Sequence, residues 1–222
     1  FSPEDMMAEL VQAYRSDPVV YGPTSRRVFD LVLQGMDPRD AALAAHEMNR
    51  GSRSNGCVMR GPPIGIWYGG AEVEVYSMAC SGLTHYDPVA GACSSFVNRM
   101  VSDLCRGRER GVAFRRALSR CRDREVALML GSFREHDPVP GLDCLLATHA
   151  SLSVFMEEET FEETLVAAVN LGGDADTVGA IAGSLAGARY GLSAIPHRWL
   201  TALQGLPEIL AIAWLLWQVA RR

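Results

Sequence analysis

The sequence contains no lysine. All 21 of its basic residues are arginine, against 26 acidic residues, and the formal net charge is −5. Arginine and lysine both serve on a solvated surface, so we attribute the absence to codon or genome composition and not to function. A net negative charge argues against a nucleic-acid-binding surface. We therefore expect no nucleic-acid partner.

A C-x-x-C pair is also missing. The six cysteines lie 12 to 23 residues apart, which argues against a zinc ribbon. A chain of 222 residues that is 48% hydrophobic does not need a disulfide framework. No basic-then-apolar signal pattern follows Phe1, which begins the chain in place of an initiator Met. Reduced thiols in the cytoplasm fit these observations best.

Long apolar runs are absent as well. The longest, in "ILAIAWLLWQVARR" near the C-terminus, is short of the roughly 20 residues that a membrane-spanning helix needs. We interpret this segment as a buried terminal helix and expect no membrane partner.

Strand signals are scarce and are confined to a brief alternation in "AEVEVYSMA", residues 71–79. Helix starts are common. Ser2-Pro3, Asp37-Pro38 and Asp87-Pro88 each combine an N-cap residue with proline at the first helical position. Further helices are expected over 109–122, 142–156, 161–171 and 177–190, and two more after Ile195-Pro196 and Leu206-Pro207. The chain therefore predicts one all-α domain over residues 1–222.

Eight arginines lie between residues 106 and 124, in "RGRERGVAFRRALSRCRDRE". Such a cluster either docks a phosphate or an acidic partner, or forms a solvated helix face. The interleaved acidic residues and the helical spacing favour the solvated face.

The segment "LGGDADTVGAIAGSLAGARYG", residues 171–191, carries the first functional signal. Asp174 and Asp176 are close enough to repel each other, so one pKa should rise unless a cation lies between them. Together with Thr177 they offer the oxygen ligands that Mg²⁺ prefers. Gly172 and Gly173 permit unusual backbone conformations, and the following helix N-terminus favours an anion. The alternative is a simple capping loop.

Three glycines follow at helical spacing, Gly179, Gly183 and Gly187. Each costs about 1 kcal/mol of helix propensity relative to alanine. We expect another helix or a ligand to approach this face closely.

Two further segments carry candidate ligand contacts. In "RSNGCVMRGPPIGIW", residues 53–67, the Asn55-Gly56 turn exposes backbone N–H groups suited to a phosphate, although such a pair often only turns the chain. In "THYDP", residues 84–88, His85 precedes a helix cap. Its imidazole either hydrogen-bonds a ligand, acts as an acid or base, or merely packs.

Taken together, these segments resemble the ADP-ribosylglycohydrolase family, which includes the dinitrogenase-reductase-activating glycohydrolases. The resemblance rests on G-G-D-A-D-T-x-G-A-I-A-G-x-L-A-G-A at 172–188, S-N-G-x-x-M-R-x-x-P-I-G at 54–65 and T-H-x-D-P at 84–88, and it covers essentially the whole chain. It implies a compact orthogonal multi-helix all-α domain with two Mg²⁺ ions in a cleft. It also implies cleavage of the glycosidic bond between ADP-ribose and a modified side chain of a protein, often arginine.

The resemblance also assigns roles to residues. Asp174 and Asp176 would be catalytic carboxylates and, with Thr177, metal ligands. ADP-ribose would be contacted by Ser54, Asn55, Gly56, His85, Gly172 and Gly173.

Two departures from the family pattern stand out. Family members carry a G-D-A-x-G segment and a T-D-D-T motif, which supply the other metal ligands, and neither occurs here. We expect a segment that was lost, cleaved or not included; a catalytically inactive ADP-ribose-binding or structural relative is the alternative. A different Mg²⁺-dependent phosphohydrolase is a weaker one. Some arginine-specific members also carry an acid where this chain has Ser52, beside Arg53, which leaves the linkage open.

Overall fold

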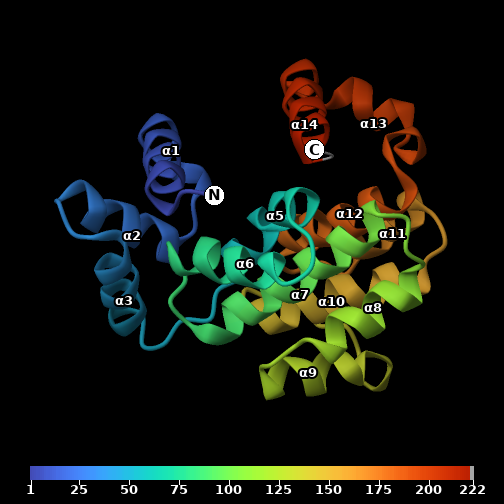
Figure 1. The fold of residues 1–222 in the computed structure, drawn as a ribbon, viewed down its shortest axis with the longest axis horizontal. Helices are drawn as coiled ribbons and strands as arrows, with labels where there is room; N and C mark the ends of the chain where they lie inside the picture. The colour runs from blue at the N-terminus through green and yellow to red at the C-terminus, as the bar shows by residue number, and fades with distance from the viewer. Residues whose placement is uncertain (221–222) are drawn as a thin grey trace.

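The computed structural model describes residues 1–220, which form fourteen α-helices and three short 3-10 helices without a sheet (Figure 1). The all-α prediction is therefore confirmed. The β-type pairing found within residues 1–220 is an isolated antiparallel bridge between Ser54 and Asp143. The α-helices are α1 Pro3–Ser16, α2 Pro23–Leu33, α3 Pro38–Met48, α4 Gly56–Arg60, α5 Pro62–Trp67, α6 Glu72–Gly82, α7 Pro88–Cys105, α8 Arg110–Ser119, α9 Arg124–Gly131, α10 Cys144–Glu157, α11 Phe161–Asn170, α12 Ala175–Tyr190, α13 His197–Ala202 and α14 Leu206–Ala220. The 3-10 helices are η1 Pro18–Val20, η2 Phe133–Glu135 and η3 Leu192–Ala194.

The helix starts expected from N-cap residues are confirmed. Ser2 Oγ accepts a hydrogen bond from the Asp5 amide, and the Asp37 and Asp87 carboxylates accept bonds from the amides two residues further on. In each case proline occupies the first turn, where no amide hydrogen is needed. These starts depend on local chemistry alone.

The brief alternation at residues 71–79 does not form a strand, because all but the first of these residues belong to α6. Its buried residues, Val73, Ser77, Cys80 and Ser81, recur at helical spacing and face α7. Val75 is 61% exposed, so the apparent alternation does not match the buried face. The pattern was too short to separate a period of two from one of 3.6.

Helix α7 runs through the middle of the main hydrophobic core, with α5, α6, α8, α10 and α12 packed around it (Figure 1). Its side chains Phe96 and Met100 are at most 2% exposed. A smaller cluster joins α1, α2 and α3 at one side of the molecule, around Tyr14 and Phe29. The Tyr14 hydroxyl donates to Asp30 at 2.8 Å and ties α1 to α2.

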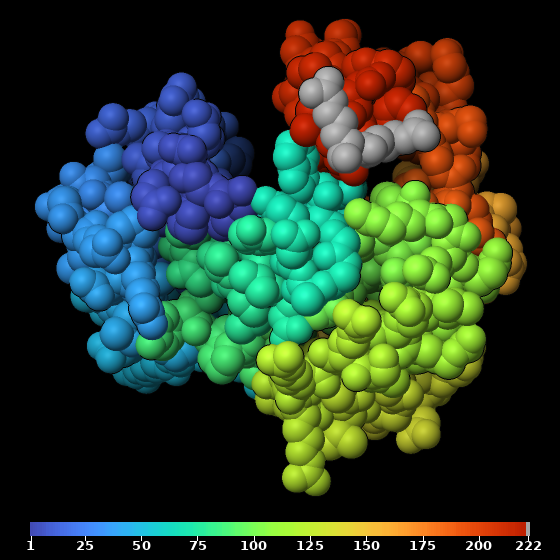
Figure 2. Space-filling model, in the orientation of Figure 1, coloured from blue at the N-terminus to red at the C-terminus, as the bar shows by residue number. Residues whose placement is uncertain are grey.

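The terminal helix was expected to be buried, and this prediction is wrong. Helix α14 lies at the edge of the molecule, and over Leu206–Ala220 no side chain is buried (Figure 2). Ile212 is 67% exposed and Leu215 is 63% exposed. Within the described residues α14 contacts mainly α5, so most of its apolar surface is uncovered. None of the helices over residues 1–220 combines the length and hydropathy needed to cross a membrane. Arg221 and Arg222, at the end of the quoted run, lie outside the described residues.

The arginine cluster is only partly a solvated face. Arg106 donates to the carbonyls of Gly65, Tyr68 and Ser102, and Arg110 donates to two carbonyls at the end of α10. These guanidinium groups satisfy backbone oxygens that helix and loop ends leave unpaired.

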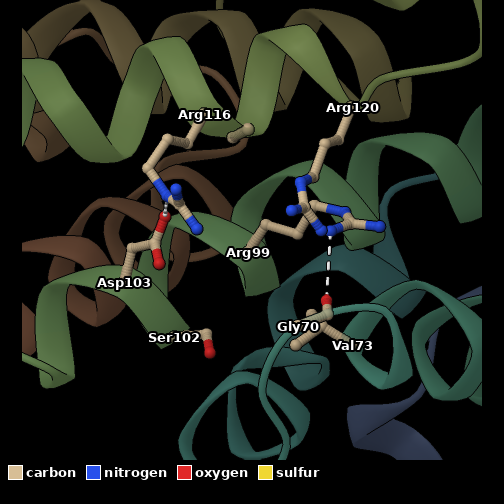
Figure 3. A pocket seen from close by; sticks show the side chains of 8 residues that line it. Gly70, Val73, Arg99, Ser102, Asp103, Arg116 and Arg120 are labelled. Carbon is tan, nitrogen blue, oxygen red and sulfur yellow. Dashed lines mark hydrogen bonds and ion pairs between the residues drawn. The ribbon is translucent and has the colours of Figure 1, made fainter.

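Salt bridges and one further hydrogen bond extend this arginine network to α7. Arg116 on α8 donates to Asp103 on α7 at 2.8 Å, and Arg99 reaches the Gly70 carbonyl at 3.2 Å (Figure 3). Asp103 also accepts a bond from Arg108 at 2.9 Å. The cluster, together with Arg99, therefore holds α8 and the α5–α6 loop against the central helix.

The glycine face of α12 packs against α11, which confirms a close helix approach. A Cβ atom added at Gly179, Gly183 or Gly187 would lie 3.4 to 3.9 Å from side chains of α11. These are ordinary van der Waals distances, so alanine fits where a larger side chain would not.

Replacement of Gly179 by alanine is therefore expected to stabilise the protein. The new methyl group would lie 3.6 Å from Val169, and alanine raises helix propensity, so the free energy of unfolding should rise by about 0.5–1 kcal/mol. Urea denaturation of the wild type and the Gly179→Ala variant measures the difference. A loss of stability would show that α11 cannot accept the added methyl group.

Candidate functional site

A pocket of about 520 Å³ opens between the α1–α2 region and the helices of the main core. Three predicted segments that are distant in the sequence meet in it: residues 54–56 at the start of α4, His85 after α6, and the start of α12. Seven of the nine predicted site residues line it: Ser54, Asn55, Gly56, His85, Asp174, Asp176 and Thr177.

Gly172 and Gly173 are not among the lining residues. Both have left-handed backbone conformations, with φ of 75° and 58°. A Cβ atom at Gly173 would lie 2.9 Å from the Pro140 carbonyl oxygen. The pair therefore lets the chain turn tightly past the loop before α10 and begin α12 at the pocket. The ligand contact expected of these two glycines stays a prediction.

Asn55 fixes the first aspartate of the motif. Its Nδ2 atom donates to Asp174 Oδ2 at 2.5 Å and to the Gly141 carbonyl at 3.0 Å. Because both amide hydrogens are used, the orientation of the buried Asn55 side chain is defined. The Asn55–Asp174 bond joins α4 to α12 across the floor of the pocket.

The capping alternative, in which Asp176 or Thr177 caps the helix, is wrong, because both residues lie within α12. The N-cap position belongs to Asp174, whose side chain makes no capping hydrogen bond within the described structure. Asp176 Oδ1 accepts a bond from the neighbouring Thr177 amide at 2.9 Å. One oxygen on each carboxylate is thus held, and within the described residues no hydrogen bond to the other oxygen is found.

The oxygen donors here fit one Mg²⁺ ion. Asp174, Asp176 and the Thr177 hydroxyl are all hard oxygen ligands at one end of the pocket. Mg²⁺ takes six such ligands and commonly keeps several waters. Over residues 1–220 no three His, Cys, Asp or Glu side chains gather as a group that could hold a metal ion.

His85 is a neutral side chain in this pocket. It is 3% exposed, and burial, helped by the nearby positive charge of Arg60, lowers its pKa to about 3. Its ring lies directly against Gly56, where an added Cβ atom would be 3.2 Å from both Cε1 and Nε2. Glycine at position 56 therefore leaves room for the imidazole at the pocket wall.

This pKa predicts that acid destabilises the protein. The folded pKa of His85 lies near 3, below the ordinary value of 6.5, so the unfolded state binds more protons between these values. Its contribution to stability is complete above pH 6.5 and is lost as the pH falls toward 3. We expect His85 to lower the free energy of unfolding by about 2 kcal/mol between pH 7 and pH 4.5. Urea unfolding at both pH values should show a smaller loss for His85→Gln, and equal losses would contradict the assignment.

Arg53 does not line the pocket, although it adjoins Ser54. Its guanidinium donates to Glu125 at 2.8 Å and to Asp143 at 3.1 Å, and these hydrogen bonds hold its pKa above the usual range. Two carboxylates thus compensate its charge. Arg53 is therefore not a free cation beside a substrate.

The opposite wall of the pocket comes from α1, η1 and α2, and sequence reasoning missed it. Ser54 Oγ donates to Thr24 Oγ1 at 3.0 Å, which joins this wall to the predicted site. The other wall residues are mainly apolar: Leu10, Val19, Val20, Tyr21, Gly22, Pro23 and Ser25. No local motif marks them, because only the packing of α1–α3 brings them to the site.

Known proteins with similar sequences are named as ADP-ribosyl hydrolases. The chain is 30% identical over 206 residues to an ADP-ribosyl-[dinitrogen reductase] glycohydrolase from Rhodospirillum rubrum, covering 90% of this chain and 65% of the relative. It is 31% identical over 136 residues to the ADP-ribosylarginine hydrolase Tri1 from Serratia proteamaculans, covering 60% of this chain and 36% of the relative. The chain thus spans less than two thirds of the length of either relative.

A solved structure shares the fold. This structure, an ADP-ribosylglycohydrolase-related protein complex, superposes with a TM-score of 0.86 at 29% identity, covering 99% of this chain and 75% of the other. The family model for ADP-ribosylglycohydrolase matches residues 1–222. With the three motif segments gathered in one pocket, the chain belongs to the ADP-ribosylglycohydrolase family.

Proposed function

We propose that this chain carries the ADP-ribose pocket and part of the magnesium site of a hydrolase that removes ADP-ribose from a modified protein side chain. The observation that carries the proposal is the convergence of residues 54–56, His85 and residues 174–177 on one pocket of about 520 Å³. A pocket that combines a mainly apolar wall with a few polar groups is typical of a small-molecule site.

In this proposal Asp174, Asp176 and Thr177 hold Mg²⁺. The bound ion would act as a Lewis acid and lower the pKa of a coordinated water. The expectation of two ions needs ligands beyond those that the described residues offer. An ADP-ribosylated protein is the proposed substrate, and arginine is the first linkage to test because the Serratia relative is named for it.

The chain's own residues have distinct tasks. Asn55, held by the Gly141 carbonyl, orients Asp174 through the 2.5 Å bond. In this proposal the negative charge of the two carboxylates stabilises positive charge that develops on a ribose ring during bond cleavage. The N-terminus of α12, sixteen residues long, adds a partial positive charge suited to an anionic ligand.

A catalytically inactive ADP-ribose-binding relative is the second candidate. It is favoured by one observation: over residues 1–220 no three His, Cys, Asp or Glu side chains form a group that could hold a metal ion. Such a protein would bind ADP-ribose and release no product.

A turnover assay separates these candidates. The protein is incubated with an ADP-ribosylated arginine peptide in Mg²⁺ or EDTA, and the products are identified by mass spectrometry. Release of intact ADP-ribose that requires Mg²⁺ is the expected result. Binding without product would favour the inactive relative, and release of AMP or phosphate would identify a phosphohydrolase. No binding and no release would overturn the proposal.

A further inference from the structure

A chain of hydrogen bonds runs behind His85, on the side away from Gly56. Arg60, the last residue of α4, donates through Nη2 to the Cys80 carbonyl at 3.1 Å and to Thr84 Oγ1 at 2.6 Å. Thr84 Oγ1 in turn lies 2.7 Å from Nδ1 of His85. Thr84 is fully buried, so water does not replace either bond.

The direction of these bonds follows from the chemistry of the groups. A guanidinium has donors and no acceptor, so Thr84 must accept the bond from Arg60. Among the described residues the Thr84 hydroxyl hydrogen has no acceptor other than Nδ1 of His85, so the hydroxyl donates and Nδ1 accepts. A neutral imidazole that accepts at Nδ1 carries its hydrogen on Nε2.

The Nε2 atom is one of the two ring atoms nearest Gly56, which itself lines the pocket. No hydrogen bond from this nitrogen is found within the described residues, and it is not among the fully buried side-chain atoms that lack a partner there, because His85 lines the pocket. The N–H group at Nε2 is therefore available to an acceptor atom of a ligand in the pocket.

We propose that Arg60 and Thr84 are positioning residues that fix His85 as its Nε2–H tautomer, so that His85 donates a hydrogen bond to an oxygen atom of ADP-ribose. This inference rests on the proposed function and deepens it. The family resemblance already implies that His85 contacts ADP-ribose; the new step is that Arg60 and Thr84 set its tautomer, which excludes His85 as the base that takes a proton during hydrolysis. It also gives a task to Arg60, a motif residue that lines the pocket.

The tautomer is tested directly by NMR. Nitrogen–hydrogen correlation spectra of protein labelled with ¹⁵N-histidine distinguish a ring protonated at Nε2 from one protonated at Nδ1, and a His85→Gln sample assigns the signal among the five histidines. We expect the Nε2–H form in the free protein. The Nδ1–H form or a doubly protonated ring at neutral pH would overturn the proposal. This result does not depend on whether the protein binds ADP-ribose.

Binding is tested with matched variants. Thr84→Val removes the hydroxyl and should weaken ADP-ribose binding, measured by calorimetry, about 10-fold, with a mixed tautomer in the spectrum. Thr84→Ser restores the hydroxyl and should bind within about twofold of the wild type. Thr148→Val, which removes an equally buried hydroxyl from α10 away from the pocket, controls for a general loss of packing.

The outcomes separate the positioning role of Arg60 and Thr84 from the proposed ADP-ribose hydrolase function. If Thr84→Val binds as well as Thr148→Val does, the positioning role is wrong. If Thr84→Val does not fold, Thr84→Ser and the wild-type tautomer still decide the matter. If the wild type binds no ADP-ribose while His85 shows the Nε2–H form, the proposed function fails and the hydrogen-bond chain stands.

Discussion

Replacement of Asp176 by asparagine is expected to lower the rate of ADP-ribose release at least about 100-fold, the loss typical when a charged stabilising group is removed from an active site. The change deletes the negative charge and one metal ligand while keeping the shape of the side chain. Asparagine also keeps an oxygen that can accept the Thr177 amide hydrogen, a bond of 2.9 Å in the wild type. The fold should therefore survive.

Asp137→Asn is the matched control for this variant. It removes one negative charge from an exposed residue in the loop before α10, which does not line the pocket. Its rate should equal that of the wild type. The kinetics are measured at saturating Mg²⁺ after both variants have been shown to unfold at the same urea concentration as the wild type. Full activity of Asp176→Asn would remove this residue from the catalytic site.

Replacement of Gly65 by alanine is expected to destabilise the fold by about 3 kcal/mol or more, in the range of severe core clashes. Gly65 lies on α5 where this helix meets α7, and an added Cβ atom would be 2.2 Å from the Asn98 carbonyl oxygen. That atom belongs to the backbone of a buried helix, so it cannot move aside as a side chain would. The two helices must separate to admit the methyl group.

Gly82→Ala is the control for this substitution. Gly82 is the last residue of α6, and a Cβ atom there would meet nothing within 4 Å. The midpoint of urea unfolding should fall sharply for Gly65→Ala and stay close to the wild-type value for Gly82→Ala. Equal midpoints would mean that the contact between α5 and α7 is looser than the structure shows.

Local signals predicted the helix starts well because capping is a short-range interaction. Ser2, Asp37 and Asp87 each bond to an amide two or three residues away, so the chemistry is readable in the sequence. The alternation at residues 71–79 was a poor guide to structure because the outcome depends on a long-range contact. Its few apolar residues fit two periods, and contact with α7 decides between them.

Burial of the terminal helix could not be predicted from its apolar residues. Hydrophobicity shows that a helix has apolar surface to cover, but it does not show which element covers it. In this structure α14 touches mainly α5, and Ile212 and Leu215 are left exposed.

The candidate site was predictable as separate motifs and not as a complete pocket. The spacing of Asp174 and Asp176 indicated a cation site, and the family resemblance linked it to Asn55 and His85. The wall that contains Thr24 has no motif, because it reaches the site through the packing of α1–α3. The bond between Thr84 and His85 joins adjacent residues, yet its direction depends on Arg60, which lies 24 residues from Thr84 in the sequence.

The central claim is that this pocket binds ADP-ribose beside a magnesium site, and calorimetric titration of ADP-ribose into the folded protein tests it most directly. We expect saturable binding at one site, tighter in Mg²⁺ than in EDTA. Asp176→Asn should abolish the effect of Mg²⁺, and Asp137→Asn should leave it unchanged. Absence of ADP-ribose binding by the folded protein, with and without Mg²⁺, would contradict the account.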